Sequence, residues 1–317
     1  MKEFLNGSTK NMMVAVDQFT DMGTAQLLRS KELIRLITGD NEKASPEILG
    51  IFNYNFDFTH KITVVTTSGK CKMHNKFMSI DGLSLMTGSP NLTWSAYNNN
   101  IECSIIFQNN SELTNLYSTY FDYIIKDPKD NGEIIKQLRL FHERQGKELN
   151  ICLAPIVNVK EFIKENIEGA REILINMFLI SRANSPSTDI IAGLEKAAKN
   201  GASIKIRVDA QQYHDPQNGS FMRPALHFLK KNKNIKIYKV GMKNGGLFHD
   251  KLLLIIKNNG DKIVILGSAG FTKSVQNNLN YENMIAIKNN DTIFEYYKRH
   301  FDGIQKNGMI KSVKLLS

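Results

Sequence analysis

Cysteine is scarce in this chain, which has three in 317 residues. Cys71, Cys103 and Cys152 form no disulfide framework, and so few thiols fit a protein of a reducing compartment. Cys71 lies three residues before His74, a spacing that occurs in zinc sites, but no second pair of Cys or His accompanies it. The sequence therefore predicts no zinc site.

Long apolar runs are absent as well. Leu252–Ile256 and Ile173–Ile180 are among the longest, well below the ~20 residues that a membrane-spanning helix needs. The first residues, Met1–Asn6, lack the apolar centre of a signal peptide. We therefore expect a cytoplasmic protein without a membrane-spanning helix.

Acidic residues are outnumbered: 31 Asp and Glu stand against 41 Lys and Arg, which gives a net charge of +10. A basic surface favours polyanionic partners, either nucleic acid or an anionic membrane. The lysine-rich stretch Lys230–Asn234 equally fits an ordinary solvated face, and the sequence does not decide between these interpretations.

What the chain does contain is one unusual pattern in two copies, about 175 residues apart. A single strand histidine is more often a structural residue than a catalyst, so the repetition carries the inference. Residues i and i+2 of a strand share a face, so each copy presents an imidazole and an ammonium together. Each copy is a His-x-Lys on an apolar strand that returns to a Gly-Ser: His74 and Lys76 with Gly88-Ser89, and His249 and Lys251 with Gly267-Ser268.

The first copy contains a strong hairpin signal, Asp81-Gly82. If these two residues alone form the turn, the facing residues follow by counting back along the strands. The expected pairs are Ile80 with Leu83, Lys76 with Thr87, and His74 with Ser89.

The turn of the second hairpin has two possible positions. A turn centred on Asn258-Asn259 sets His249 opposite Ser268. A turn at Asn259-Gly260 sets Lys251 opposite Ser268 instead. The sequence leaves both registers open.

The repeat extends beyond the motifs, which indicates duplication of a whole α/β unit. Asn100-Ile101-Glu102 matches Asn280-Tyr281-Glu282, and Tyr120–Ile124 matches His300–Ile304 on an expected helix. Strands alternate with helices, which is typical of α/β layers. In the second copy the expected elements are strands at Ile173–Ile180, Ile204–Val208 and Ile235–Tyr238, and helices at Asp189–Lys199 and Thr292–Ile304.

His-x-Lys-x4-Asp followed by Gly-Ser-x-Asn resembles the phospholipase D (HKD) superfamily. The first copy matches in full, with Asp81 and Asn91 in the remaining positions. The second has Ile256 where the Asp is expected and Gly270 where the Asn is expected. The resemblance implies an α/β fold of two phospholipase D-like α/β/α halves packed as an internal pseudo-dimer. We place the first half at residues 1–140 and the second half at residues 141–317.

The resemblance also implies one active site between the halves, a covalent phosphohistidine intermediate, and no metal or other cofactor. In-line attack on a phosphodiester needs a nucleophilic and an acidic histidine, and lysines stabilise the phosphoryl oxygens. We expect His74 to be the nucleophile because its motif is complete, and His249 to be the acid. A monomer is then sufficient for activity.

Further side chains are expected to complete this site. Ser89, Ser268 and Asn91 can donate hydrogen bonds to the phosphate, while Asp81 serves the structure of the motif. Each histidine also needs its other ring nitrogen held, for which a carboxylate serves well. Glu102 and Glu282 are the candidates for that role.

Three functions compete. The first is a metal-independent nuclease on DNA or RNA, favoured by the net charge. The second is a phospholipase D or phosphatidyl transferase acting on phospholipid, for which Trp94, Tyr97, Phe221 and Met222 could form a docking surface, although a surface that stacks bases would look the same. The third is a binding module with a decayed site, against which the two intact His-Lys pairs argue.

Overall fold

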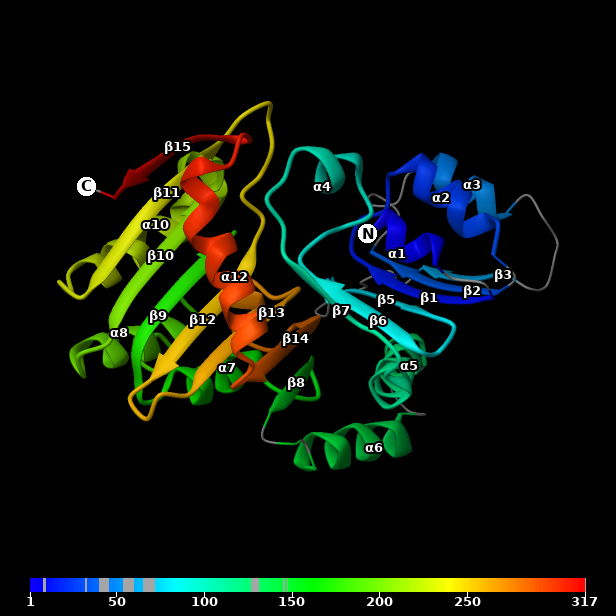
Figure 1. The fold of residues 1–317 in the computed structure, drawn as a ribbon, viewed down its shortest axis with the longest axis horizontal. Coiled ribbons are helices and arrows are strands. Elements are labelled where there is room, and N and C mark those ends of the chain that lie inside the picture. The colour runs from blue at the N-terminus through cyan, green and yellow to red at the C-terminus, as the bar shows by residue number, and fades with distance from the viewer. Residues whose placement is uncertain are drawn as a thin grey trace.

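The structure is a computed structural model, shown in Figure 1. Cys71, and with it the spacing to His74, lies outside the described residues. The described residues are 1–7, 10–31, 33–39, 46–53, 60–64, 72–126, 131–144, 146 and 148–316.

Two sheets lie side by side, one in each half. The first has the order β3 (His60–Val64), β2 (Leu33–Thr38), β1 (Asn11–Val16), β5 (Lys76–Ile80), β6 (Ser84–Gly88), β7 (Ser104–Phe107). The second has the order β15 (Ile310–Leu315), β11 (Ile235–Met242), β10 (Ser203–Asp209), β9 (Ala170–Met177), β12 (Lys251–Lys257), β13 (Lys262–Gly267), β14 (Asn280–Lys288). Two further strands pair with β14, namely β4 (Lys72–Met73) and β8 (Leu149–Ala154).

The two sheets repeat one topology, which confirms the duplication. Strands β3-β2-β1-β5-β6-β7 correspond in order to β11-β10-β9-β12-β13-β14. In both runs the first three strands are parallel and the last three join by antiparallel pairing. The expected strands of the second half match β9, β10 and β11, apart from shifts of a few residues at their ends.

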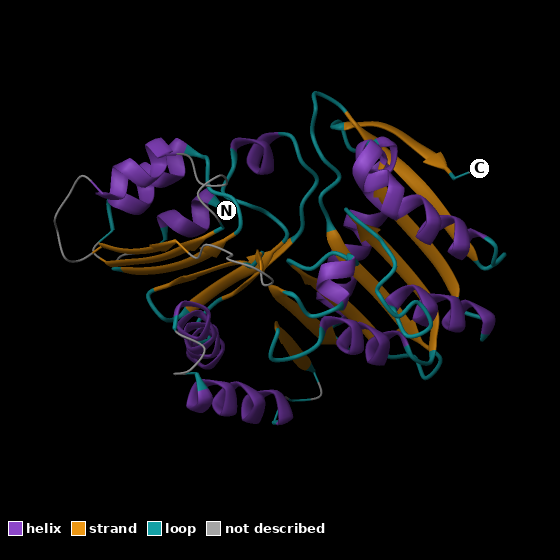
Figure 2. Cartoon of the chain, turned by 180° about the vertical axis from the view of Figure 1, so that it is seen from behind, coloured by secondary structure: helices purple, strands orange, loops and turns teal. Residues whose placement is uncertain are grey.

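Helices cover both faces of the first sheet (Figures 1 and 2). Alternation along β1 decides which residues face which layer. Val14 and Val16 pack with the short helices on one face, and Met13 and Ala15 pack with α5 on the other. These helices are α1 (Lys2–Asn6), α2 (Met22–Arg29) and α3 (Pro46–Asn53) on the first face, and α5 (Ser111–Ile125) and α6 (Gly132–Glu143) on the second.

In the second half, α12 (Asp291–Gly303) lies across the near face of the sheet in Figure 1. The expected helices match α8 and α12 within one residue at their ends. Among the described residues, no helix is long and apolar enough to cross a membrane. The remaining helices are α4 (Trp94–Asn98), α7 (Val159–Ile167), α8 (Ile190–Lys199), α9 (Ala210–His214), α10 (Pro216–Lys230), α11 (Lys273–Gln276) and the 3-10 turn η2 (Ile304–Lys306).

The two halves share a core, so they do not merely touch. Tyr117 and Tyr120 of α5 are buried in one cluster with Leu153 of β8 and Ile285 of β14. The Tyr120 hydroxyl donates to the carbonyl of Ala154, across the halves. This packing fixes the position of one motif relative to the other.

The expected register of the first hairpin is wrong by one residue. Asp81 and Gly82 do form a tight turn, with φ of 52° and 67°. However, Ile80 pairs with Ser84 and Phe77 with Thr87, so Lys76 does not face Thr87. Leu83 is left out of the ladder: its N–H donates to the Ile80 carbonyl over 3.1 Å, and its carbonyl accepts from the backbone N–H of Asn110 over 2.7 Å.

Both registers left open for the second hairpin are also wrong. Leu252 pairs with Leu266, and the Lys257 N–H donates to the Asp261 carbonyl over 2.8 Å, which closes a loop one residue longer than expected. Continued to the start of β12, this register sets Lys251 opposite Gly267, just as the first hairpin sets Lys76 opposite Gly88. The lysine of each motif thus faces the glycine, and not the serine, of Gly-Ser.

Candidate active site

Each motif histidine is reached by the other half of the chain. The backbone N–H of His74 donates to the Tyr281 carbonyl over 3.0 Å, next to the pairing of β4 with β14. Reciprocally, the N–H of His249 donates to the Ile101 carbonyl over 2.9 Å. Each histidine is therefore docked on the central residue of the Asn-x-Glu segment from the opposite half.

As a result, the glutamate of each half contacts the histidine of the opposite half. Nδ1 of His74 lies 2.9 Å from Oε2 of Glu282, and Nδ1 of His249 lies 2.8 Å from Oε2 of Glu102. Both carboxylates are buried or nearly so. The sequence singled out these two glutamates, but nothing in it tells which histidine each one holds.

Each glutamate is held in turn by two neighbours from its own half. The Ser89 hydroxyl donates to Glu102 over 2.5 Å, and Nδ2 of Asn100 donates to it over 3.0 Å. In the second half, the Ser268 hydroxyl donates to Glu282 over 2.5 Å, and Nδ2 of Asn280 does so over 3.1 Å. The structure thus places both serine hydroxyls on the carboxylates. Asn100 and Asn280 were missed, although the repeated Asn-x-Glu pattern was a signal for them.

The glycine of each Gly-Ser is required by a close approach of two strands. A Cβ at Gly88 would lie 2.3 Å from the carbonyl oxygen of Cys103, and one at Gly267 would lie 2.1 Å from that of Asn283. The next residue in each copy donates its backbone N–H to the same carbonyl over 2.9 Å. Only glycine therefore lets β6 and β13 deliver their serines to the glutamates.

The two motif lysines are buried beside their histidines, each about 1% exposed, and Lys251 also lines the cavity described below. Nζ of Lys76 donates to the His74 carbonyl over 2.9 Å, and Nζ of Lys251 donates to the His249 carbonyl over 3.0 Å. Burial lowers the pKa of both lysines, that of Lys76 to about 8. Two such ammonium groups provide a strong field for an anion.

The other two predicted residues take different positions. Oδ1 of Asn91 accepts a hydrogen bond from the backbone of Gln18 over 3.2 Å, at the wall of the site. Asp81 lies at the hairpin turn, where one carboxylate oxygen accepts the backbone N–H groups of Lys10 and Asn11 over 2.9 and 2.8 Å. Asp81 therefore ties the start of β1 to the hairpin.

One asymmetry separates the two histidines, and the sequence did not reveal it. Oδ2 of Asp17, just after β1, lies 3.8 Å from Nε2 of His74. The corresponding residue after β9 is Phe178, whose ring packs edge-on against His249 with centroids 4.8 Å apart. On that side, Nζ of Lys251 lies 3.0 Å from Nε2 of His249.

These surroundings act differently on the two imidazoles. Burial lowers the pKa of His249 to about 4, against the opposing effect of Glu102. Burial lowers the pKa of His74 as well, but there both Glu282 and Asp17 favour the protonated ring. The second carboxylate thus makes His74 easier to protonate than it would otherwise be, whereas Nε2 of His249 faces an ammonium and stays without a proton.

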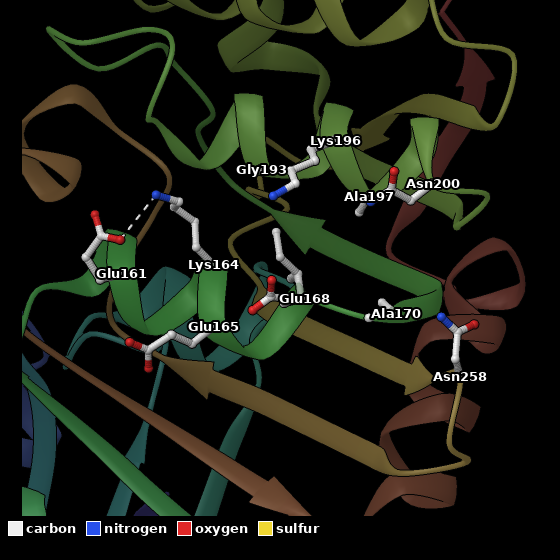
Figure 3. Close-up of a pocket in the computed structure, with 12 residues that line it drawn as sticks. Glu161, Lys164, Glu165, Glu168, Ala170, Gly193, Lys196, Ala197, Asn200 and Asn258 are labelled. Carbon is white, nitrogen blue, oxygen red and sulfur yellow. Dashed lines mark hydrogen bonds and ion pairs between the residues drawn. The ribbon is translucent and has the colours of Figure 1, made fainter.

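Both histidines line one cavity of about 440 Å³ between the halves. Its wall also includes Lys251, Asn91 and Gly270. A second hollow, of about 330 Å³, is shown in Figure 3 between α7, α8 and the turn at Asn258. It lies at the far end of β12 from His249 and is lined by side chains of mixed charge. Within the described ranges, no group of three His, Cys, Asp or Glu is arranged to hold a metal ion.

Solved structures with similar folds cover most of this chain. Phosphatidylserine synthase of Haemophilus influenzae Rd KW20 matches with a TM-score of 0.69 and 11% identity, over 99% of this chain and 84% of that one. Yeast tyrosyl-DNA phosphodiesterase matches with 0.56 and 11%, over 88% and 82%. Polyphosphate kinase of Porphyromonas gingivalis matches with 0.62 and 14%, over 96% of this chain but only 44% of the kinase.

Among curated proteins, none matches the sequence. A protein family does: the one described as "Cardiolipin synthase, PLD-like domain" matches residues 1–125 and 163–305. These two stretches contain both His-x-Lys motifs and both glutamates that hold the histidines. The chain therefore belongs to the phospholipase D-like family, as a member that carries two motifs in one chain.

Proposed function

We propose that this protein is a metal-independent phosphodiesterase that cleaves nucleic acid through a phosphohistidine intermediate. The observation that carries the proposal is the pair of imidazoles in one cavity, each with Nδ1 held by a glutamate from the opposite half. This leaves both Nε2 atoms for chemistry, with two buried ammonium groups beside them. Such a set supplies nucleophile, acid and charge stabilisation from side chains alone.

We assign the nucleophile to His249 and the acid to His74, the reverse of what motif completeness suggests. Nδ1–H of His249 donates to Glu102, and the Lys251 ammonium donates to Nε2, so this ring is neutral with its lone pair on Nε2. When substrate binds, the ammonium turns to a phosphoryl oxygen and releases that lone pair for attack. His74 has a carboxylate at each nitrogen and is the better proton carrier.

The reaction then balances in two steps. In the first, Nε2 of His249 attacks phosphorus, the P–O bond to the leaving group breaks, and Nε2 of His74 gives its proton to the departing oxygen. In the second, neutral His74 takes a proton from water, the water oxygen attacks phosphorus, and the P–N bond breaks. Lys76 and Lys251 stabilise the negative charge on the phosphoryl oxygens in both steps.

Nucleic acid is the substrate class that the net charge of +10 favours, because a basic chain gains affinity from counterion release along a phosphate backbone. The second candidate is phospholipid hydrolysis or transfer, which the family description supports through its reference to cardiolipin synthase. One chain contributes both motifs, so we propose that a monomer is active. The two buried, unpaired thiols Cys103 and Cys152 support a cytoplasmic location.

The test is turnover of labelled single-stranded DNA, duplex DNA, RNA and phosphatidylglycerol vesicles, all in excess EDTA. We expect cleavage of nucleic acid that survives the chelator and disappears in His249→Ala. We also expect binding of nucleic acid by His74→Ala to weaken by ~10²-fold or more between low and moderate salt. Turnover of vesicles alone would replace the nuclease proposal with the phospholipid one. Activity that EDTA abolishes and a divalent ion restores would refute the mechanism.

A further inference from the structure

The residue between the histidine and the lysine of the second motif is a buried carboxylate. By the alternation of a strand, Asp250 shares a face with Leu252 and Leu254, which pack in one cluster with residues of α12. Its Oδ2 lies 2.6 Å from Nε2 of His300 on α12 and accepts from Nδ2 of Asn176 over 2.9 Å. Among the described residues, its buried Oδ1 finds no hydrogen-bond partner. A carboxylate buried so completely is costly unless a cation pairs with it, so His300 is its main stabilising contact.

This contact holds the chain where the ladder of the sheet has not yet begun. The pairing of β12 with β9 starts at Lys251, so His249 and Asp250 lie before it. The Asp250 carbonyl accepts from the N–H of Phe178 over 3.1 Å. The Phe178 ring in turn lies edge-on to His249, and its centroid lies 5.5 Å from Nζ of Lys251. Asp250 is thus the central residue of a short segment that carries the proposed nucleophile and a buried ammonium.

The first half holds its corresponding residue through a neutral pair. Asn75 lies between His74 and Lys76, and its Nδ2 donates to the Tyr120 hydroxyl over 3.3 Å. Tyr120 of α5 is the residue that matches His300 of α12 in the repeat. Asn75 and Tyr120 are fully buried, whereas the His300 side chain is 26% exposed and can exchange protons with solvent. A neutral pair is therefore sufficient at this position, and the ion pair of the second half needs a separate reason.

Other titratable or charged groups act on the ion pair from the elements around it. Burial and Arg207 lower the pKa of His300, but Asp250 raises it, and the balance lies above 6.5. Burial also raises the pKa of the phenol and the thiol among these groups, so both are neutral. The charge of His300 therefore changes at a pH above 6.5, and the ion pair weakens there. The groups are Arg207 of β10, Lys251 of β12, Tyr297 of α12 and Cys103.

We propose that the ion pair of His300 with Asp250 positions the nucleophile, because it holds the segment 249–251 so that Nε2 of His249 is directed at phosphorus. His300 touches neither the substrate nor the reacting atoms, so it is a positioning residue that acts through Asp250. When His300 loses its proton, it keeps at most a neutral hydrogen bond to Asp250, about half as strong as a charge-assisted one. The nucleophilic half then loosens, while the acidic half with its neutral pair is unchanged. This inference rests on the proposed function and adds a means of regulation to the same site.

The test compares three combinations of residues at positions 250 and 300 by the burst of p-nitrophenol from methyl p-nitrophenyl phosphate. This leaving group departs without a proton from His74, so the burst reports the attack by His249. His300→Gln keeps a donor but not the charge. The double variant, Asp250→Asn with His300→Tyr, copies the neutral pair of the first half. The control is His214→Gln, which removes an exposed histidine of α9 in the same half.

At about pH 6 we expect His300→Gln to slow the burst by about ten- to a hundred-fold with an unchanged substrate Kd, since a misplacement of ~1 Å costs up to ~10²-fold. The native burst rate should fall toward that of His300→Gln as the pH rises through the pKa of His300. The double variant should stay within a few-fold of the native rate and lack this fall, and His214→Gln should follow the native profile. Any limb that the lysines cause is common to all four proteins. A purely structural contact would lower stability without separating these pH profiles.

A second readout does not depend on turnover. NMR of isotope-labelled histidines follows the His249 ring, which should give one sharp Nδ1–H tautomer in the native protein and the double variant, and a broadened signal in His300→Gln. If the native protein shows no burst, the proposed function fails and the NMR signal alone decides on positioning. If the native protein gives a burst, the positioning role is refuted by a His300→Gln burst that matches it at every pH. It is equally refuted by an unchanged His249 signal in His300→Gln, or by a folded double variant that is as slow as His300→Gln at about pH 6. In each of these cases the phosphodiesterase stands.

Discussion

Replacing Glu102 by Gln tests the core of the mechanism, because the side chain is surrounded by donors. It accepts from Nδ1 of His249, from the Ser89 hydroxyl and from Nδ2 of Asn100. A glutamine adds an NH₂ group that must face at least one of them. If the NH₂ group faces His249, Nδ1 of the ring can only accept a hydrogen bond. The ring proton then moves to Nε2, and the lone pair that attacks phosphorus is lost.

The size of the effect follows from that change of tautomer. When a carboxylate that holds a catalytic imidazole becomes an amide, kcat falls about 10⁴-fold with the geometry intact. We expect Glu102→Gln to lower kcat by about 10³- to 10⁴-fold. The shape of the side chain is kept and a buried charge is removed, so the thermal melting temperature should not fall enough to explain this loss.

The assay is rapid-mixing release of p-nitrophenol from methyl p-nitrophenyl phosphate. Glu102→Gln should abolish the first-turnover burst. The mirror variant, Glu282→Gln, should keep a burst because p-nitrophenolate departs without a proton from His74, although later turnovers slow. Near-native turnover by Glu102→Gln, or a burst lost only in Glu282→Gln, would show that the tautomer of His249 does not control the chemistry.

Four further outcomes are expected. His74→Ala should release about one equivalent of p-nitrophenol from methyl p-nitrophenyl phosphate and leave a methylphosphoryl group on Nε2 of His249, and a modified residue found elsewhere by mass spectrometry would contradict this assignment. Asp17→Asn should move the alkaline limb of the pH profile of kcat/KM to lower pH, because the native carboxylate favours the protonated form of His74. An unmoved limb would count against His74 as the acid. Asp81→Ala should lower the free energy of unfolding by about 1–3 kcal/mol in urea titrations, since two backbone donors lose their acceptor. Nε2 of His300 lies 2.6 Å from Oδ2 of Asp250, and this contact raises the pKa of His300 above 6.5 although burial lowers it. The stability that the protonated ring contributes is complete below pH 6.5 and is lost as the pH rises through the raised pKa. The melting temperature of the native protein should therefore fall relative to that of His300→Gln over this pH range.

The sequence predicted the parts of the site that repeat. His74, His249, Glu102 and Glu282 could be singled out because the duplication repeats each pattern, and the same repeat indicated two similar α/β units. The partner of each glutamate could not be found, since it depends on how the halves dock. The predicted hairpin registers were wrong because a turn signal places the turn and not the pairing beyond it: Asp81 and Gly82 form the expected turn, yet Ile80 pairs with Ser84.

Asp17 shows the opposite limit. It lies outside every motif, and its contact with His74 arises only because β1 ends beside the start of β5. Its counterpart, Phe178, differs in chemistry, so comparison of the two copies gave no pattern to follow. Differences between duplicated halves are thus where sequence repetition gives no guidance and the structure is needed.

The exchange of glutamates has a consequence for the order in which the chain is made. A ribosome that has released only the first half has produced His74 and Lys76, but the carboxylate that holds this imidazole belongs to Glu282, 208 residues further along the chain. Likewise, Glu102 has no imidazole to hold until His249 has been made, 147 residues later. His74 lacks its carboxylate until β14, which contains Glu282, has been added and paired. A chain truncated before β14 therefore lacks Glu282 and cannot assemble the complete pair of held imidazoles.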